Sequence, residues 1–266
     1  MTTISPFPFS PPFVIGVLHL PPLPGAPGAV DPIDRIKASV CEEARLLAEA
    51  GYDGLILENF GDAPFFAEVV PPHTVAAMTV VARAVRKTVQ LPLGINVLRN
   101  DAMSALAIAH ATGAAFVRVN VLTGVYATDQ GTIEGRAAEV VRYRARIDST
   151  ALIFADIHVK HATPISQPDV VLAAEETAYR GRADALILTG ATTGRAADLE
   201  QVRRVREAVP DRPIVIGSGI TPDTIAAALE HADGVIVGTA LKVDGQTTHP
   251  IDPERARALI RAVRSR

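Results

Sequence analysis

Short apolar segments alternate along the chain with longer segments in which apolar residues recur every three or four positions. Eight of the short segments are rich in Val, Ile and Leu and apolar nearly throughout, which is typical of strands buried on both faces of a parallel sheet. They span residues 13–20, 53–59, 92–98, 116–120, 151–157, 184–190, 213–219 and 234–240. The longer segments, such as 34–51, 73–89 and 101–113, have the period of covering helices.

Eight strand-and-helix units in a chain of this length predict a single (β/α)₈ TIM barrel of the α/β class. The alternative is an open doubly wound sheet, but no Gly-x-Gly-x-x-Gly follows the first strand, where a dinucleotide fold would place it. No Gly- or Pro-rich linker divides the segments. We therefore expect one domain over residues 13–266, preceded by a proline-rich, extended lead-in at 1–12 that covers one end of it.

Composition changes this picture mainly by exclusion. The formal net charge is −3 and aromatic residues make up 5%, whereas a nucleic-acid surface needs clustered positive charge and aromatic rings for stacking, so we expect no nucleic-acid partner. The single cysteine, Cys41, excludes a disulfide framework and a thiolate zinc site. No signal-peptide pattern and no apolar run of about 18 residues is present, so we expect a soluble, cytoplasmic protein.

The barrel prediction places the active site at the carboxyl ends of the strands. Nearly every predicted strand ends in polar or charged side chains: His19, Glu58, Asn59, Asn96, Arg118, Asn120, Asp156, His158, Thr189, Ser218 and Thr239. Strands that simply become polar as they leave the core would explain each residue singly, but not the collection. We assign substrate binding to five of them: Asn59, Asn96, Arg118, Asn120 and Thr189.

The sharpest local motif follows the predicted seventh strand. Residues 217–219 carry little side-chain bulk, so their backbone can approach a ligand, and Thr221 with Pro222 predicts the start of a helix whose N-terminus favours an anion. A second small-residue turn ends the eighth strand. Loops after strands seven and eight often bind phosphate in such barrels, although glycines also serve merely to form tight turns. The predicted phosphate-binding residues are Gly217, Ser218, Gly219, Gly238 and Thr239.

The segment FADIHVKH, residues 154–161, carries three ionisable side chains on alternate positions. If the chain stays extended, Asp156, His158 and Lys160 point to the same side. A histidine near a carboxylate is a sensible general acid/base pair. We therefore assign catalysis to Asp156 and His158, together with Glu58 and His19, and expect Lys160 in the following loop, on an anionic part of the substrate.

Other chemistries stay open at this stage. A divalent metal on the four catalytic candidates is an alternative, because oxygen and imidazole ligands suit such ions, although no His-x-His or His-Glu-x-x-His spacing appears. A Schiff base needs a lysine in a desolvated position, and Lys160 and Lys242 are both expected to lie too far out. Lys242 either reaches the phosphate or is a solvated surface group.

The connection at 122–135 is long for a compact barrel and contains three glycines. Loops of this kind are often lids or binding loops. We expect the polar residues Tyr126, Thr128, Asp129 and Gln130 over the mouth, with Asp129 in contact with substrate. The alternative is a solvated connection without a function.

Several phrases resemble the BtpA family, which is named for a photosystem I biogenesis protein. They include GVLHLPPLPGAP at 16–27, GINVLRNDA at 94–102 and FADIHVKHATP at 154–164, and the resemblance runs in order from about residue 13 to 245. It implies a phosphate-binding-type barrel. Without assigning roles, it supports a set of family-typical positions: His19, Glu58, Asn59, Asn96, Asn120, Asp156, His158 and Lys160.

Two classes of function follow. In the first, the protein is an enzyme that anchors and converts a small phosphorylated metabolite resembling a sugar phosphate, as an isomerase, epimerase, lyase or hydrolase. In the second, it is an assembly or stability factor of the photosystem I biogenesis type. The charged barrel mouth favours the first and the family name favours the second. Barrels of this size often self-associate, so we also expect a homo-oligomer.

Overall fold

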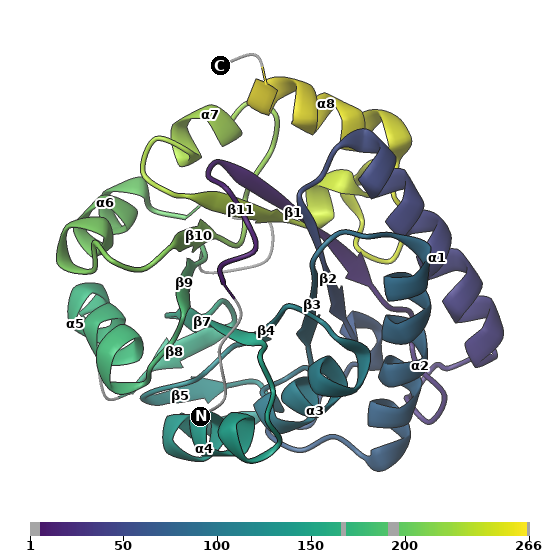
Figure 1. Cartoon of the computed structure of the whole chain (residues 1–266), viewed down its shortest axis with the longest axis horizontal. Helices are drawn as coiled ribbons and strands as arrows, with labels where there is room; N and C mark the ends of the chain where they lie inside the picture. The colour runs from purple at the N-terminus through teal and green to yellow at the C-terminus, as the bar shows by residue number, and fades with distance from the viewer. Residues whose placement is uncertain (1–5, 166–168, 191–196, 265–266) are drawn as a thin grey trace.

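The computed structural model describes residues 6–165, 169–190 and 197–264, and its centre is a closed barrel of eight parallel strands (Figure 1). The strands follow one another around the barrel in the order β1-β11-β10-β9-β7-β4-β3-β2. Their bounds are β1 Phe13–His19, β2 Gly54–Glu58, β3 Leu93–Asn96, β4 Phe116–Val119, β7 Leu152–Ile157, β9 Ala185–Leu188, β10 Ile214–Ile216 and β11 Gly234–Val237. The predicted TIM barrel is confirmed.

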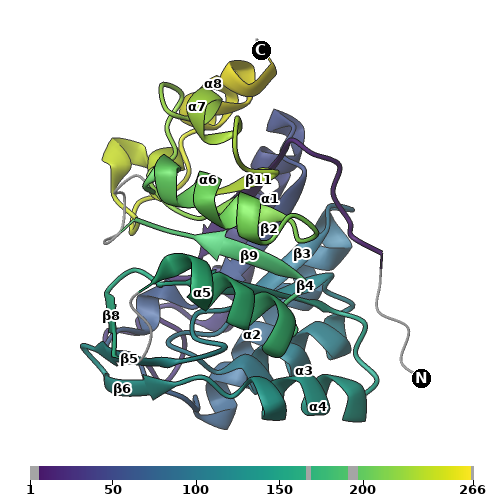
Figure 2. The same cartoon turned by 90° about the vertical axis from the view of Figure 1, so that its left-hand side faces the viewer.

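Helices surround the barrel on the outside (Figures 1 and 2). They are α1 Ile33–Ala50, α2 Pro72–Thr88, α3 Ala102–Thr112, α4 Ala137–Arg146, α5 Val170–Glu175 with a π turn at Glu176–Arg180, α6 Leu199–Ala208, α7 Ile225–Ala228 and α8 Pro253–Arg264. Short 3₁₀ turns lie at Phe60–Asp62, Thr239–Leu241 and Val243–Gly245. Within the described residues, no helix combines the length and apolar character needed to cross a membrane.

The interior of the barrel is a separate apolar core inside the larger core between strands and helices. Phe116 and Phe154 stack in it with ring centroids 4.5 Å apart. Glycine makes room for these rings, since a Cβ on Gly94 would lie 2.2 Å from the ring of Phe116. The interior aromatic residues come from the beginnings of strands, so they fill the end opposite the mouth.

The described part of the N-terminal segment, residues 6–12, contains no helix or strand. Two of its side chains extend the interior aromatic cluster: Phe9 stacks on Phe13 at 4.7 Å between centroids, and Phe7 stacks on Phe154 at 5.7 Å. Residues 1–5 of the predicted lead-in lie outside the described residues. The packing of these two rings shows that the segment contributes apolar surface to the closed end of the barrel.

A small antiparallel sheet of three strands lies beside the barrel, at the lower left of Figure 2. Strands β5 (Val125–Thr128) and β6 (Gly131–Glu134) form a hairpin, and β5 also pairs with β8 (Ala162–Pro164). The connection at 122–135 is therefore a structured hairpin rather than an open loop. It joins the segment after β4 to the segment after β7, and it has an apolar core of its own: Val121, Tyr126, Ile133 and Val159.

Candidate active site

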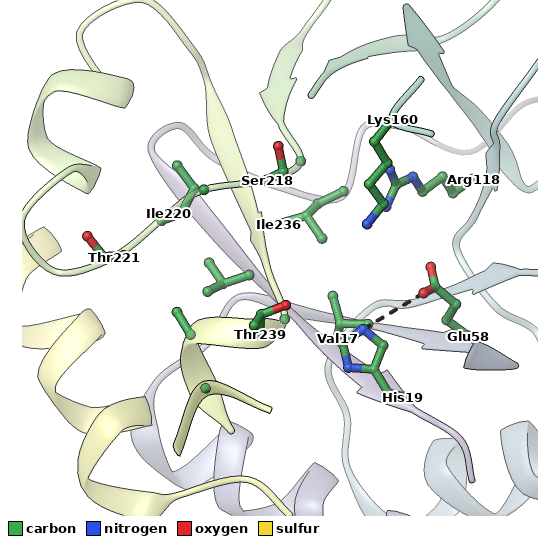
Figure 3. Close-up of a pocket in the computed structure, with 16 residues that line it drawn as sticks. Val17, His19, Glu58, Arg118, Lys160, Ser218, Ile220, Thr221, Ile236 and Thr239 are labelled. Carbon is green, nitrogen blue, oxygen red and sulfur yellow. Dashed lines mark ion pairs between the residues drawn. The ribbon is translucent and has the colours of Figure 1, made fainter. Parts of the chain in front are cut away.

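Two adjoining cavities open at the carboxyl ends of the barrel strands. The first, of about 160 Å³, has small residues after β10 and β11 at one end and ionisable side chains at the other (Figure 3). The second, of about 540 Å³, lies under the β5–β6 turn and shares Glu58 and Lys160 with the first. A ligand that fills both cavities would therefore contact both of these side chains.

The small-residue end of the first cavity contains all five residues that the sequence predicts for phosphate: Gly217, Ser218, Gly219, Gly238 and Thr239. Gly219 has a φ of +69°, a conformation that glycine adopts without strain. Among the described residues, none accepts a hydrogen bond from the backbone N–H of Gly219 or Ile220. Two backbone donors that line a cavity without partners suit an anion.

The predicted helix start beside this turn is wrong. Helix α7 begins at Ile225 and contains only four residues, so Thr221 does not cap it. Instead, the Thr221 N–H donates to Thr224 Oγ1 over 2.9 Å, and Thr224 Oγ1 donates to the Gly219 carbonyl over 3.1 Å. These bonds fold residues 219–224 into a compact turn, so the backbone of the turn, rather than a long helix, faces the cavity.

Asp156 is fully engaged by an arginine. Arg118 Nε and Nη2 donate to its two carboxylate oxygens, each over 2.8 Å, and Asn120 Nδ2 donates over 3.3 Å. Both charged residues are buried. Burial alone would lower the pKa of Arg118, but the pairing with Asp156 raises it above its ordinary value. Asp156 thus fixes a permanent cation on the wall of the first cavity, where Arg118 lies.

The expectation that Asp156, His158 and Lys160 point to one side is wrong, because the extended chain ends at Ile157. His158 has a φ of +51°, which breaks the alternation of a strand. Its ring lies edge-on to the ring of Tyr126, with centroids 6.3 Å apart, on the side of the antiparallel sheet. The Asp156–His158 acid/base pair is therefore not assembled.

Lys160 lies deeper than expected. The backbone N–H of Lys160 donates to Thr189 Oγ1 over 3.1 Å, which directs the side chain into the mouth, where it lines both cavities. Burial, followed by the nearby charge of Arg118, lowers the pKa of Lys160, and Glu58 and Asp156 oppose this effect. The prediction that Lys160 stands too far out is corrected.

His19 and Glu58 stand together on the opposite wall (Figure 3). Nε2 of His19 lies 3.8 Å from Oε1 of Glu58, and both side chains are at least nine-tenths buried. Burial, and then the charges of Lys242, Lys160 and Arg118, lower the pKa of His19 to about 3. His19 is therefore a neutral imidazole at physiological pH, and its buried Nδ1 has no partner among the described residues.

The asparagines mainly shape the mouth. Asn59 Oδ1 accepts from the Leu98 N–H over 2.7 Å and fixes the loop after β3. Asn96 donates to Asn120 Oδ1 over 3.0 Å, and its own buried Oδ1 has no partner within the described residues. Asn120 and Asp129 line the second cavity, Asp129 from the tip of the hairpin. Of these predicted substrate-binding residues, Asn120 and Asp129 therefore line one of the two cavities of the mouth.

Arg99 is a residue of the second cavity that the sequence analysis missed. It is buried, and its Nη2 donates to the Lys160 carbonyl oxygen over 2.5 Å. Burial lowers its pKa. The signal was available in the sequence, since Arg99 follows the third predicted strand by one residue. Phe60, Phe65 and His161 also line this cavity and lie in connections, where sequence periodicity gives no orientation.

Lys242 does not line the cavity that contains the predicted phosphate-binding residues. Its ammonium group is buried and binds both oxygens of Glu43 on α1, over 3.0 and 3.1 Å. Cys41 is a buried thiol on the same helix. Among the described residues, no three His, Cys, Asp or Glu side chains gather as metal ligands would, so the four catalytic candidates do not form such a group.

Comparison with solved structures shows the fold. Phosphoribosylanthranilate isomerase of Thermotoga maritima superimposes with a TM-score of 0.60 and 13% sequence identity, covering 96% of this chain and 100% of that chain. The phosphoribosyl anthranilate isomerase of Thermus thermophilus gives a TM-score of 0.57 and 14% identity, over 95% and 98% of the two chains.

Sequence relatives span more than nine-tenths of the chain. The photosystem I biogenesis protein BtpA of Synechocystis is 47% identical over 94% of this chain and 87% of its own length. An uncharacterized protein of Pyrococcus furiosus is 45% identical over 93% of both chains, and a mitochondrial protein of Caenorhabditis elegans is 33% identical over 92% and 90%. The sequence profile of the BtpA family matches residues 11–265. The chain therefore belongs to the BtpA family.

Proposed function

We propose that the protein is an enzyme that binds a small phosphorylated metabolite, of the size of a sugar phosphate, at the mouth of the barrel. One observation carries the proposal: the turn at 217–219 and the turn at 238–239 face Arg118 and Lys160 across one cavity. Backbone donors without a partner among the described residues on one side, and cations on the other, are features that bind phosphate in proteins.

The charges of the mouth support an anionic ligand. Arg118 and Lys160 line the first cavity, with Glu58 as its one lining carboxylate among the described residues, and Asp156 binds Arg118 from behind the wall; Arg99 and Asp129 line the second cavity. Glu58 lies 3.8 Å from the neutral imidazole of His19 and, among the described residues, has no Lys or Arg within ion-pair distance. The second cavity extends from Glu58 and Lys160, so it accommodates the part of the ligand beyond the phosphate.

Glu58 is the group that we assign to proton transfer. Its carboxylate lies at the junction of the two cavities, next to the space a bound ligand would occupy. His19, as a neutral imidazole, can donate or accept a hydrogen bond without adding charge. Asp156 acts through Arg118, as a positioning residue. Two solved structures with the same fold are phosphoribosylanthranilate isomerases by name, which supports the phosphate assignment by analogy of fold.

The test is the melting temperature of purified, metal-stripped protein with inorganic phosphate, sugar phosphates and their unphosphorylated counterparts. A ligand at about 100 times its Kd adds roughly 2.7 kcal/mol of stability, which for a chain of this size raises the Tm by roughly 5–10 °C. Only the phosphorylated compounds should give this rise. If the unphosphorylated sugars match them, or if no compound in the panel moves the Tm, the phosphate site is wrong.

Two variants of one residue make the test specific. Gly219→Asp and Gly219→Asn have nearly the same shape, and both residue types tolerate positive φ. They differ by one negative charge beside the cavity. We expect Gly219→Asn to keep part of the phosphate-induced rise in Tm and Gly219→Asp to abolish it. Equal behaviour of the two variants would show that the turn does not bind an anion.

The name of the Synechocystis relative favours a second candidate function. That relative is called a photosystem I biogenesis protein, and an assembly factor does not require a ligand. If the phosphorylated panel leaves the Tm unchanged, this candidate becomes the better one. The chain would then be tested as bait for partner proteins, with the barrel mouth mutated as the control surface.

A further inference from the structure

The four lysines of the chain lie in four different settings. Lys37 pairs with Asp34 on the surface of α1, and Lys87 is exposed on α2. Lys242 is buried but neutralised by Glu43. For Lys160, no carboxylate of the described residues lies within ion-pair distance, although its side chain is largely enclosed in the mouth. This residue is the only one of the four that meets open cavity space without an ion-pair partner among the described residues.

The surroundings of Lys160 suit an amine that must lose its proton. Arg118 and Arg99 line the same cavities as Lys160, and Arg99 donates a hydrogen bond to the carbonyl oxygen of Lys160. Neighbouring cations and burial disfavour the ammonium form, and the pKa of Lys160 is accordingly lowered. Lysines that act as nucleophiles in proteins are activated by desolvation or by an adjacent cationic group.

The opposite wall of the cavity supplies a proton carrier. Lys160 lies in the segment that follows β7, and Glu58 is the last residue of β2; in Figure 3 both side chains point into the same open space. The small-residue turns lie on a third side of this space. A ligand held at 217–219 by its phosphate would therefore present its next atoms between the amine and the carboxylate.

We propose that Lys160 forms a Schiff base with a carbonyl carbon of the substrate, which makes the substrate class a phosphorylated aldehyde or ketone. The proposal rests on the proposed function, since the phosphate site delivers the carbonyl group. Phosphate binding alone requires neither a nucleophile nor a covalent intermediate, so the Schiff base is a separate claim.

The step balances with the groups present. Glu58 takes one proton from the ammonium group through a bridging water molecule, since the two groups lie beyond ion-pair distance. The amine nitrogen then attacks the carbonyl carbon and passes a second proton to the carbonyl oxygen, which becomes a hydroxyl. Glu58 returns its proton to this hydroxyl, which leaves as water while the nitrogen lone pair forms the C=N bond. The product is a protonated imine on Lys160, one water molecule and an unprotonated Glu58, with no oxidant or reductant consumed.

The experiment is reductive trapping on the wild-type protein. The protein is incubated with dihydroxyacetone phosphate and, separately, with erythrose 4-phosphate, and sodium borohydride is then added. Borohydride delivers hydride to an imine carbon and leaves a stable secondary amine, which intact mass and peptide mapping locate. We expect one adduct per chain on Lys160 and at least tenfold less on Lys37, Lys87 or Lys242. Excess inorganic phosphate should suppress the adduct.

Two controls keep the outcome decisive. Lys160→Met should lose the adduct, whereas Lys87→Met should keep it. Absence of an adduct on Lys160, or equal labelling of the surface lysines, overturns the Schiff base. The phosphate-induced rise in Tm of the wild-type protein then separates the two claims: if the rise is present, only the Schiff base fails, and if it is absent, the phosphate site fails as well.

Discussion

The amino-terminal half of the barrel interior is filled by aromatic rings, whereas the carboxyl-terminal mouth of the same strands is lined by ionisable groups. Phe116 and Phe154 stack at one end of β4 and β7, and Arg118 and Asp156 pair two residues further along the same strands. The same parallel pairing of β4 with β7 therefore carries two layers, the aromatic pair and, nearer the mouth, the charged pair. The barrel therefore separates its apolar core from its charged site by only two residues along each of these strands.

The largest expected effect is at the closed end. Phe154→Ala should lower the free energy of unfolding by about 3–5 kcal/mol, since it removes a fully buried ring from the stack. The phosphate-induced rise in Tm should be unchanged. Urea denaturation and thermal shift measure the two quantities, with Phe66→Ala, which is 57% exposed, as a control within about 0.5 kcal/mol of wild type.

A comparable loss of stability is expected from a substitution in the mouth, but there the phosphate-induced rise in Tm should be lost as well. Arg118→Met leaves the carboxylate of Asp156 buried without its partner, which costs about 3–5 kcal/mol. The double variant Arg118→Met, Asp156→Leu should recover most of this stability and still show no phosphate-induced rise in Tm. Recovery of both would contradict the assignment of Arg118 to the ligand.

The pH dependence of stability gives the next effect. The pKa of His19 is about 3 in the folded protein and about 6.5 in an unfolded chain. Below pH 6.5 the unfolded state therefore binds a proton that the folded state does not, and stability is lost as pH falls toward 3. The loss is about 2 kcal/mol at pH 5.

Substitution of His19 isolates this contribution. His19→Gln removes the titrating group, so the difference in unfolding free energy between wild type and variant should shift in favour of the variant between pH 7 and pH 5. Urea titrations at several pH values measure it. A pH-independent difference would mean that His19 titrates alike in the folded and unfolded states.

The smallest effect concerns Lys160. Lys160→Met replaces an enclosed cation that lacks a described carboxylate partner, so we expect a gain of about 1 kcal/mol, the usual trade between activity and stability. Lys242→Met should act in the opposite direction, because it leaves Glu43 without its partner. A loss of stability on Lys160→Met would show that Lys160 serves the fold rather than the ligand.

The apolar pattern predicted the barrel because each strand is buried on both faces, so its composition alone marks it. Strand boundaries were right within a few residues, as at β7, predicted at 151–157 and observed at Leu152–Ile157. The hairpin at 125–134 was missed. Its strands have four residues each and bury one face against a core of only a few side chains, so the local sequence gives little sign of pairing.

The sequence predicted where the residues of the candidate site lie, but not which residues pair with one another. Strand ends placed Glu58, Arg118 and Asp156 at the mouth, where they lie. The sequence could not show that Asp156 binds Arg118, since 38 residues separate them. The left-handed backbone of His158 also ended the alternation of the strand, so an extended-chain reading gave the wrong directions for that residue and for Lys160. Such torsions depend on tertiary contacts and leave no periodic trace in the sequence.

The three-stranded sheet ties the segment after β4 to the segment after β7, since β5 pairs with both β6 and β8. The two segments therefore share one set of backbone hydrogen bonds and cannot open independently. Amide hydrogens on β5 and β8 should exchange with solvent at one common rate, as a single cooperative unit. Asp129 and Lys160, which line the second cavity, lie on the two segments that this sheet joins, so their relative position is held by the same backbone hydrogen bonds.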